Sequence, residues 1–233
     1  MKVVEIQGNQ CIRLFKPSPP VPPDNVKALN FIRGIESRYG FFQGPRTIAD
    51  VNLQSGVAFL RGQFKNRWFI EKFQLFNHGI TAEAKVATDE LDEFLDDATS
   101  WARQQLGFSE REFDFGARLY LSQIEVEIDL PFDAAFARFE EFGAHLAALA
   151  KSYGRDGVPN FGVSDFRLAA GAGELVSDVA GADFIFARKA GTTKEANRYF
   201  SSAPVKTADH LKLLDELVSV FNSMKADARQ RPA

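Results

Sequence analysis

Residues Gly56–Ala87, GVAFLRGQFKNRWFIEKFQLFNHGITAEAKVA, decide the fold of this chain. Two aromatic-rich runs are separated by Lys65-Asn66-Arg67, and Asn77-His78-Gly79 gives a second turn signal. The last run, Ile80–Val86, alternates apolar with more polar residues, as a strand with one buried face does. The stretch therefore predicts a three-stranded antiparallel meander.

Helical patterns flank the meander on both sides. Thr88 stands where an N-cap is expected, and an apolar stripe runs from there to about Leu106. The stripe consists of Leu91, Phe94, Leu95, Ala98, Trp101, Ala102 and Leu106. Upstream, we expect a first strand within Lys2–Phe15 and a helix that ends at Tyr39-Gly40. The intervening Pro17–Pro23 is interpreted as a stiff extended connector rather than as a motif for a proline-binding module.

The second half continues the alternation of strands and helices. A long strand is expected over Ala117–Leu130, and Pro131 then opens a helix with a mostly aromatic seam. The seam consists of Phe132, Phe136, Phe139, Phe142, Leu146, Leu149 and Tyr153. Shorter strands are expected at Phe161–Ala169 and Asp183–Arg188. A last helix, capped by Thr207, is expected to run to about Lys225.

The order of these elements places the chain in the α+β class. We expect one or more antiparallel sheets with helices packed chiefly on one face. The two halves, residues 1–107 and 117–226, read as pseudo-repeated strand-helix-strand-strand-helix units, either separate or sharing one continuous sheet as a single domain. Ser37-Arg38-Tyr39-Gly40 and Lys151-Ser152-Tyr153-Gly154 end the first helix of each half. Residues 227–233 are expected to form a frayed tail.

Composition and charge argue against several classes of protein. The chain has 233 residues, 45% hydrophobic and 25% charged, which is enough for a substantial core. A formal net charge of −3 argues against the nucleic-acid backbone as the main partner. Cys11 is the only cysteine, so no intrachain disulfide forms, and a reducing compartment, the cytoplasm, is expected. No membrane segment, secretory leader or cofactor is expected.

The densest acidic group lies on the helix predicted after Thr88. It consists of Asp89, Glu90, Asp92, Glu93, Asp96 and Asp97. Carboxylates at helical spacing are candidate ligands for Mg²⁺ or Mn²⁺. The helix dipole also favours acids in the first turns, and these residues lie opposite the apolar stripe. We therefore interpret them as a solvated face and predict no metal site.

Histidine, serine and glycine give no catalytic motif. His78, His145 and His210 lie far apart and lack metal-ligand spacing. Ser201-Ser202 near His210 suggests a Ser/His/Asp arrangement, but no G-x-S-x-G elbow supports it, and cap or surface roles are favoured. Gly171-Ala172-Gly173 follows a predicted strand without a basic residue to receive phosphate, which favours a flexible connection.

Protein association is the leading functional hypothesis. The chain lacks a catalytic motif and has 23 phenylalanines, which favours a non-catalytic cytosolic protein that works as a homodimer or as a subunit of a larger assembly. The expected contact elements are the hairpin around Trp68 and the last helix. Alternation along the hairpin directs Phe69 and Phe73 to the core and Trp68 to the other side. The interaction residues are Arg61, Lys65, Arg67, Trp68, Leu211, Leu214, Val218 and Phe221.

Two alternatives stay open. Residues 189–206 form a long polar connection before a helix N-terminus, and they predict a small-anion or nucleotide site, including that of an enzyme. Its residues are Arg198, Tyr199, Ser201 and Ser202. Burial of Tyr199 and Phe200 against the sheet would weaken this alternative. The cations and aromatics of the hairpin 61–73 predict single-stranded nucleic-acid binding, although a structural role for them is favoured.

Overall fold

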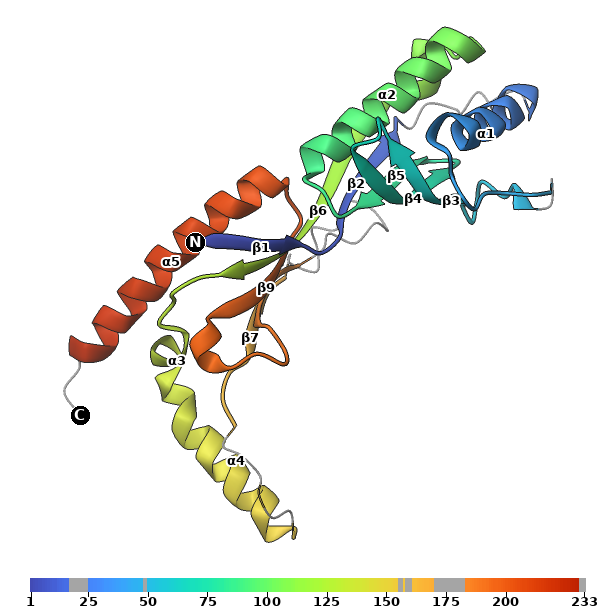
Figure 1. Ribbon diagram of the computed structural model, residues 1–233. Helices are drawn as coiled ribbons and strands as arrows, with labels where there is room; N and C mark the ends of the chain where they lie inside the picture. Colours follow the sequence, from blue (N-terminus) through green and yellow to red (C-terminus); the bar gives the residue numbers. More distant parts are fainter. Residues whose placement is uncertain (17–24, 48–49, 155–156, 158–160, 170–182, 231–233) are drawn as a thin grey trace. The chain divides into compact units, whose positions relative to one another are not determined.

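The fold is described from a computed structural model of the 233-residue chain (Figure 1). The structure describes residues 1–16, 25–47, 50–154, 157, 161–169 and 183–230. The predicted connector Pro17–Pro23, the segment Gly171-Ala172-Gly173 and residues 231–233 of the predicted tail lie outside the described residues.

Strands and helices alternate along the chain, much as the sequence predicts. The strands are β1 (Lys2–Ile6), β2 (Asn9–Phe15), β3 (Val57–Phe64), β4 (Trp68–Phe76), β5 (Gly79–Ala84), β6 (Phe115–Glu127), β7 (Asp165–Leu168), β8 (Phe184–Arg188) and β9 (Arg198–Ala203). The α-helices are α1 (Asn25–Tyr39), α2 (Thr88–Leu106), α3 (Phe132–Ala135), α4 (Glu140–Ser152) and α5 (Thr207–Gln230). Short 3₁₀ turns are η2 (Glu110–Phe113), η3 (Ala137–Phe139) and η4 (Lys194–Ala196).

The strands of the described residues form one antiparallel sheet of nine strands. Their order is β3-β4-β5-β2-β6-β9-β8-β7, and β1 pairs with β6 beside this path. Helices that are segregated from an antiparallel sheet confirm the α+β class. Strand, helix, three strands and helix follow one another from β2 to α2, and again from β6 to α5 with α3 and α4 in the place of α1. The structural repeat itself stays a prediction.

The chain divides into two compact units. The first, which we call the meander unit, contains Ile6–Gln123 and Ala203–Ala208. The second, which we call the arm unit, contains Met1–Glu5, Ile124–Ser202 and Asp209–Ala233. One boundary between the units lies within β6, after Gln123, so each unit contains part of this strand. The domain ranges drawn from the sequence stay predictions.

Aromatic packing between the sheet and two helices forms the core of the meander unit. Strands β3, β4 and β5 pair as predicted, with Phe59 opposite Phe73. Helices α1 and α2 cover one face of these strands. Phe94 of α2 is fully buried and meets Tyr39, Phe64 and Phe73 edge-on, with ring centroids 4.9, 5.6 and 5.7 Å away. Many of the phenylalanines therefore stabilise the fold by burial and edge-to-face contact.

The facing of the hairpin residues corrects the sequence prediction. Trp68 is buried, with 9% of its surface exposed, whereas Phe69 is 68% exposed. Alternation breaks on both paired strands at one level, because Arg61 on β3 adopts a positive φ of 57°. On β4, the residues after the break bury Phe73 and Leu75, which are odd-numbered. The residues before the break, on the side of the hairpin turn, bury the even-numbered Trp68 and Ile70. The expected exposed side chain is therefore in the core, and its neighbour is on the surface.

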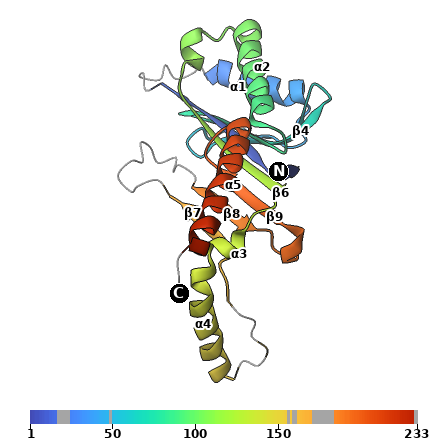
Figure 2. The ribbon, with the colours of Figure 1, turned by 90° about the vertical axis from the view of Figure 1, so that its left-hand side faces the viewer.

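The arm unit has its own aromatic core. Phe132 is buried, and its ring centroid lies 5.6 to 6.3 Å from those of Phe186, Tyr199 and Phe221. The predicted helix after Pro131 is broken into α3, η3 and α4, so its aromatic seam serves two roles. Its beginning fills the core, whereas α4 extends away from β7, β8 and β9 (Figures 1 and 2).

Candidate functional site

The acidic cluster on α2 is paired with cations from other elements. The pairs are Asp89–Lys206, Glu90–Arg67, Asp92–Arg13, Glu93–Lys65, Asp96–Arg13 and Asp97–Arg38, with N to O distances from 2.6 to 3.4 Å. The solvated-face prediction is wrong for Asp92, which is 8% exposed, and it misses the partners of the other five. Sequence periodicity gives a polar face, but it does not reveal which distant cations fold onto it.

Arg13 of β2 is the centre of this ion-pair network and is 1% exposed. Its guanidinium donates to Asp92 Oδ1 at 2.9 Å and to Asp96 Oδ1 at 2.6 Å. Burial lowers the pKa of Arg13, but the hydrogen bonds to Asp96 and Asp92 outweigh it and leave that pKa above its ordinary value. Burial raises the pKa of Asp92, but hydrogen bonds from Arg13, Lys206 and Tyr120 leave it below its ordinary value. The network is ionised and structural, with its central carboxylate already satisfied.

The basic hairpin is engaged by the same helix. Lys65 Nζ donates to Glu93 at 2.7 Å, and Arg67 also pairs with Glu93, at 3.4 Å. The ring of Trp68 packs against those of Phe64 and Phe94. The structure therefore brings Lys65 and Arg67 onto α2 and Trp68 into the core, whereas Arg61 is exposed. The paired cations and the buried Trp68 ring are not available to stack bases and bind phosphates, which weakens the nucleic-acid alternative.

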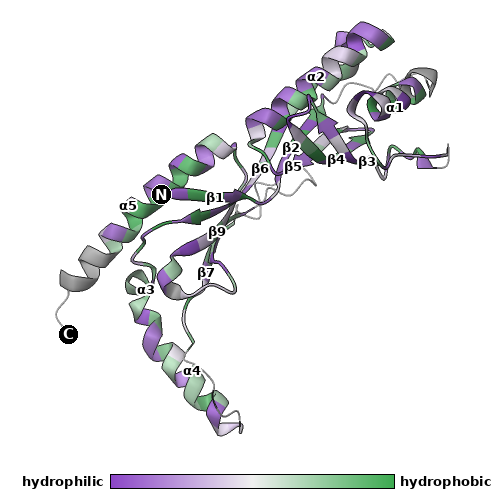
Figure 3. Cartoon of the chain, viewed as in Figure 1, coloured by the Kyte–Doolittle hydropathy of each residue, from purple (hydrophilic) through white to green (hydrophobic). Residues whose placement is uncertain are grey.

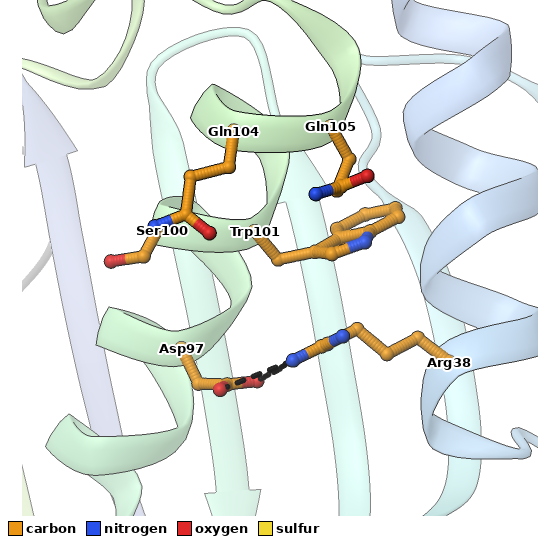
Figure 4. A pocket seen from close by; sticks show the side chains of 6 residues that line it. All are labelled: Arg38, Asp97, Ser100, Trp101, Gln104 and Gln105. Atoms are coloured by element: carbon orange, nitrogen blue, oxygen red, sulfur yellow. Dashed lines mark hydrogen bonds and ion pairs between the residues drawn. The ribbon is translucent and has the colours of Figure 1, made fainter.

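A polar pocket of about 430 Å³ lies between α1 and α2 (Figure 4). Its lining consists of Arg38, Asp97, Ser100, Trp101, Gln104 and Gln105. Arg38 donates to both carboxylate oxygens of Asp97 at 3.0 to 3.2 Å and lies over the Trp101 ring. Because the one cation among these six residues is already paired, the pocket offers amides and an indole but no uncompensated charge. Sequence reasoning missed this pair, whose members are 59 residues apart.

Thr88 and Thr207, predicted as caps of their own helices, cap each other's helix instead. Thr88 Oγ1 accepts a hydrogen bond from the Thr207 backbone N–H at 2.9 Å, and Thr207 Oγ1 accepts one from the Thr88 N–H at 3.1 Å. Asn9 Nδ2 donates to Thr207 Oγ1 at 2.9 Å. These groups lie inside the meander unit, to which Ala203–Ala208 belongs. The exchange satisfies buried helix N-terminal donors.

Ser201 and His210 do meet, but as a core contact. Ser201 Oγ lies 2.9 Å from His210 Nε2, and both residues are fully buried. Ser201 Oγ also donates to the carbonyl oxygen of Ile185 at 3.0 Å. With the hydroxyl proton engaged there, Nε2 is the donor to Oγ. A serine nucleophile needs the reverse direction and access to substrate. The expected surface role of His210 is wrong, because its ring lies in the core of the arm unit.

The predicted anion-binding residues do not converge. The expected polar loop contains strand β9, in which Tyr199, Ser201 and Ser202 are buried. Alternate residues of a strand point to opposite faces, so Arg198 and Ser202 lie on one face and Tyr199 and Ser201 on the other. Arg198 Nε forms an ion pair with Glu125 at 3.2 Å. Tyr199 is buried and Phe200 is half-buried, so the burial that would weaken this alternative is met for the first residue only.

Helix α4, by contrast, presents an apolar face to solvent. Figure 3 shows hydrophobic residues among the hydrophilic ones of this helix. The face, which we call the α4 face, consists of Phe139, Phe142, Leu146, Leu149 and Tyr153, exposed by 55, 68, 39, 55 and 78%. Phe142, Leu146 and Leu149 lie on α4, and Phe139 and Tyr153 are the residues that flank it as N-cap and C-cap. Spacings of three and four residues place them along one side of the helix. The adjoining flank is covered by the chain itself: Gly143 and Ala147 are buried, and a Cβ on Gly143 would lie 2.1 Å from the carbonyl oxygen of Phe161.

Helix α5 uses its apolar stripe mainly for its own core. Leu214 and Phe221, predicted as contact residues, are 0 and 3% exposed, which leaves them no free surface. Leu211 and Val218 are half-buried. Among the α5 side chains that the structure describes, up to residue 224, the large apolar ones that are exposed lie beside this stripe and are Leu213, Val220 and Met224.

No protein-family model matches the chain, and no curated protein matches it. Over the described part of the chain, no helix has the length and apolar character to cross a membrane. The same residues hold no group of three His, Cys, Asp or Glu placed to bind a metal ion. The candidate site therefore rests on the physical properties of the surface, of which the α4 face is the most distinctive.

Proposed function

We propose that this chain is a non-catalytic protein that works by associating with a second protein chain, either another copy of itself or a different protein. We propose further that the α4 face is its contact surface. The observation that carries this proposal is the exposure of five large apolar residues along one side of α4 and its two cap residues. Isolated exposed apolar residues are normal on any protein, whereas a contiguous patch is typical of an interaction site.

The size of the face supports the same conclusion. From their exposed fractions, the five residues present on the order of 600 Å² of accessible surface when each fully exposed side chain is taken at roughly 200 Å². The largest apolar patch of a typical monomer is about 300 to 600 Å² and is often functional, so this face lies at the upper end of that range. Three of the five are aromatic, a residue class enriched at protein interfaces.

The cytoplasm is the proposed location. Cys11 is a free thiol and is buried in the core of the meander unit. Burial raises its pKa, which disfavours the reactive thiolate. A lone, unreactive thiol is compatible with a reducing compartment.

Native mass spectrometry of the protein, purified gently from its own host, tests the proposed function. We expect a complex, with itself or with another protein, that is lost on Phe142→Glu and kept on Ala148→Glu. Ala148 is exposed on the other side of the same helix, so the control adds the same charge at a matched place. A parent protein that is alone at every concentration contradicts the proposal, and so does a complex that survives Phe142→Glu.

A further inference from the structure

We infer that the occupant of the α4 face is the α4 face of a second copy of this chain, with the two helices antiparallel. This inference rests on the proposed function and names its partner. The reasons are the spacing of the apolar residues, the distribution of charge along α4 and the area that the contact would bury.

The spacing of the α4 face makes it self-complementary. Phe139, Leu146 and Tyr153 recur every seven residues, and Phe142 and Leu149 stand three residues after the first two. These are the a and d positions of a heptad. In an antiparallel pair, a residues lie opposite d residues, so each layer combines side chains from the two sets. The same surface then serves on both copies, which gives a closed two-fold dimer rather than a filament.

Charge along the helix favours the antiparallel direction. Glu140 and Glu141 lie in the first turn of α4, and Lys151 lies in the last. By the same spacing these three charges point away from the seam, so they do not meet across it, but an antiparallel pair opposes the dipoles of the two helices. A parallel pair aligns the two dipoles. Arg138 and His145 flank the α4 face, and the antiparallel direction also keeps the two copies of Arg138 at opposite ends of the pair.

The buried area sets the strength of the dimer. Two α4 faces together bury about 1,200 Å², the lower end of the range for specific, stable interfaces. The total reaches this limit when the partner presents a surface of equal extent that covers the whole face, and a second copy does so while leaving no apolar part of either face in water. We therefore expect a dimer that dissociates on dilution.

Sedimentation equilibrium of the purified full-length protein over a wide concentration range tests self-association. We expect a reversible monomer–dimer equilibrium. Leu146→Glu should raise the dimer Kd by roughly a hundredfold, because a hot-spot position at the interface centre is lost on both copies. Ala148→Glu should leave the Kd near that of the parent. Far-UV circular dichroism checks that each variant is folded.

Disulfide cross-linking under mild oxidation tests the direction of the helices. The double variants Phe142→Cys/Tyr153→Cys and Phe139→Cys/Leu149→Cys represent the two a-to-d registers of an antiparallel pair. Their cysteines are about 15 Å apart within one helix, too far for an internal bond. We expect one double variant to form covalent dimers and the two single substitutions from which it is built to form none, since the native Cys11 is buried. Cross-linking of a single variant such as Tyr153→Cys with itself means a parallel pair and overturns the inference.

The two proposals fail in different ways. A purified protein that stays monomeric but binds another host protein through Phe142 overturns self-pairing and leaves the association function standing. A protein that binds neither itself nor a host protein overturns both.

Discussion

Replacing Arg13 by methionine tests the ion-pair network of the meander unit. The side chain is 1% exposed and donates to Asp92, which is itself largely buried, and to the exposed Asp96. Methionine keeps the apolar stem but removes the charge. The variant leaves Asp92 buried without its central partner.

The expected loss is about 2 to 3 kcal/mol in the free energy of unfolding. Breaking a buried ion pair on one side typically costs about 3 to 5 kcal/mol. The loss is smaller here because Lys206 at 3.0 Å and the Tyr120 hydroxyl at 2.9 Å still contact Asp92. The pair with Asp96 contributes little, since that carboxylate is 60% exposed. The substitution also removes Arg13 Nε, a buried donor that has no hydrogen-bond partner among the described residues, and this further reduces the loss.

Urea unfolding followed by tryptophan fluorescence measures the loss. Both tryptophans, Trp68 and Trp101, belong to the meander unit, so the signal reports the unit that contains Arg13. Arg118→Met is the matched control. Arg118 lies on β6 directly opposite Arg13 of β2 in the strand register, but its side chain is exposed. The control should change stability by less than about 0.5 kcal/mol. If Arg13→Met costs no more than Arg118→Met, the network does not stabilise the unit.

The same pair of proteins gives a pH prediction. The folded pKa of Asp92 lies below its ordinary value of 3.8. A depressed carboxyl pKa contributes stability above the unfolded pKa and loses it as the pH falls through the folded one. The stability gap between parent and Arg13→Met should therefore be full at neutral pH and should shrink in acid below the ordinary Asp pKa. A gap that is constant or grows in acid contradicts the role of the ionised carboxylate.

Three further sets of substitutions test the packing of the meander unit, each measured by urea unfolding. Thr88→Ala and Thr207→Ala should each cost about 1 to 2 kcal/mol, with the double variant losing less than the sum, and strict additivity would contradict the exchanged caps. Gly34→Ala should destabilise by about 1 to 3 kcal/mol despite the better helix propensity of alanine, because its Cβ would lie 2.1 Å from an indole carbon on α2; a more stable variant refutes that close approach. Trp68→Ala should cost about 3 to 5 kcal/mol and Phe69→Ala less than about 1 kcal/mol, and equal losses would show that the assigned facing is wrong.

The meander and α2 follow from the sequence because their periodicity is regular. Strand β5 buries alternate residues from Ile80 to Ala84, and α2 has the predicted bounds, Thr88–Leu106. The facing of Trp68 does not follow, since it depends on the positive φ of Arg61 on the neighbouring strand. A prediction from alternation assigns each side chain to a face of the sheet by its position along the strand. A single residue with left-handed backbone reverses the assigned face of every residue that follows it.

The candidate site depends on information that periodicity does not contain. The sequence identifies the seam of apolar residues on α4, but it does not reveal that Phe132 enters the core while Phe142 faces solvent. That division depends on the break between α3 and α4 and on the chain that covers Gly143. Likewise, the partners of Asp92 lie 79 residues before it on β2 and far after it at Lys206. Such contacts are properties of the tertiary fold.

The molar mass of the parent in solution, measured beside Leu146→Glu and Ala148→Glu, decides whether the α4 face joins two copies of the chain. We expect the mass of the parent and of Ala148→Glu to rise with concentration towards that of a dimer, and the mass of Leu146→Glu to stay that of a monomer. The same concentration dependence in all three proteins would contradict a contact through the α4 face.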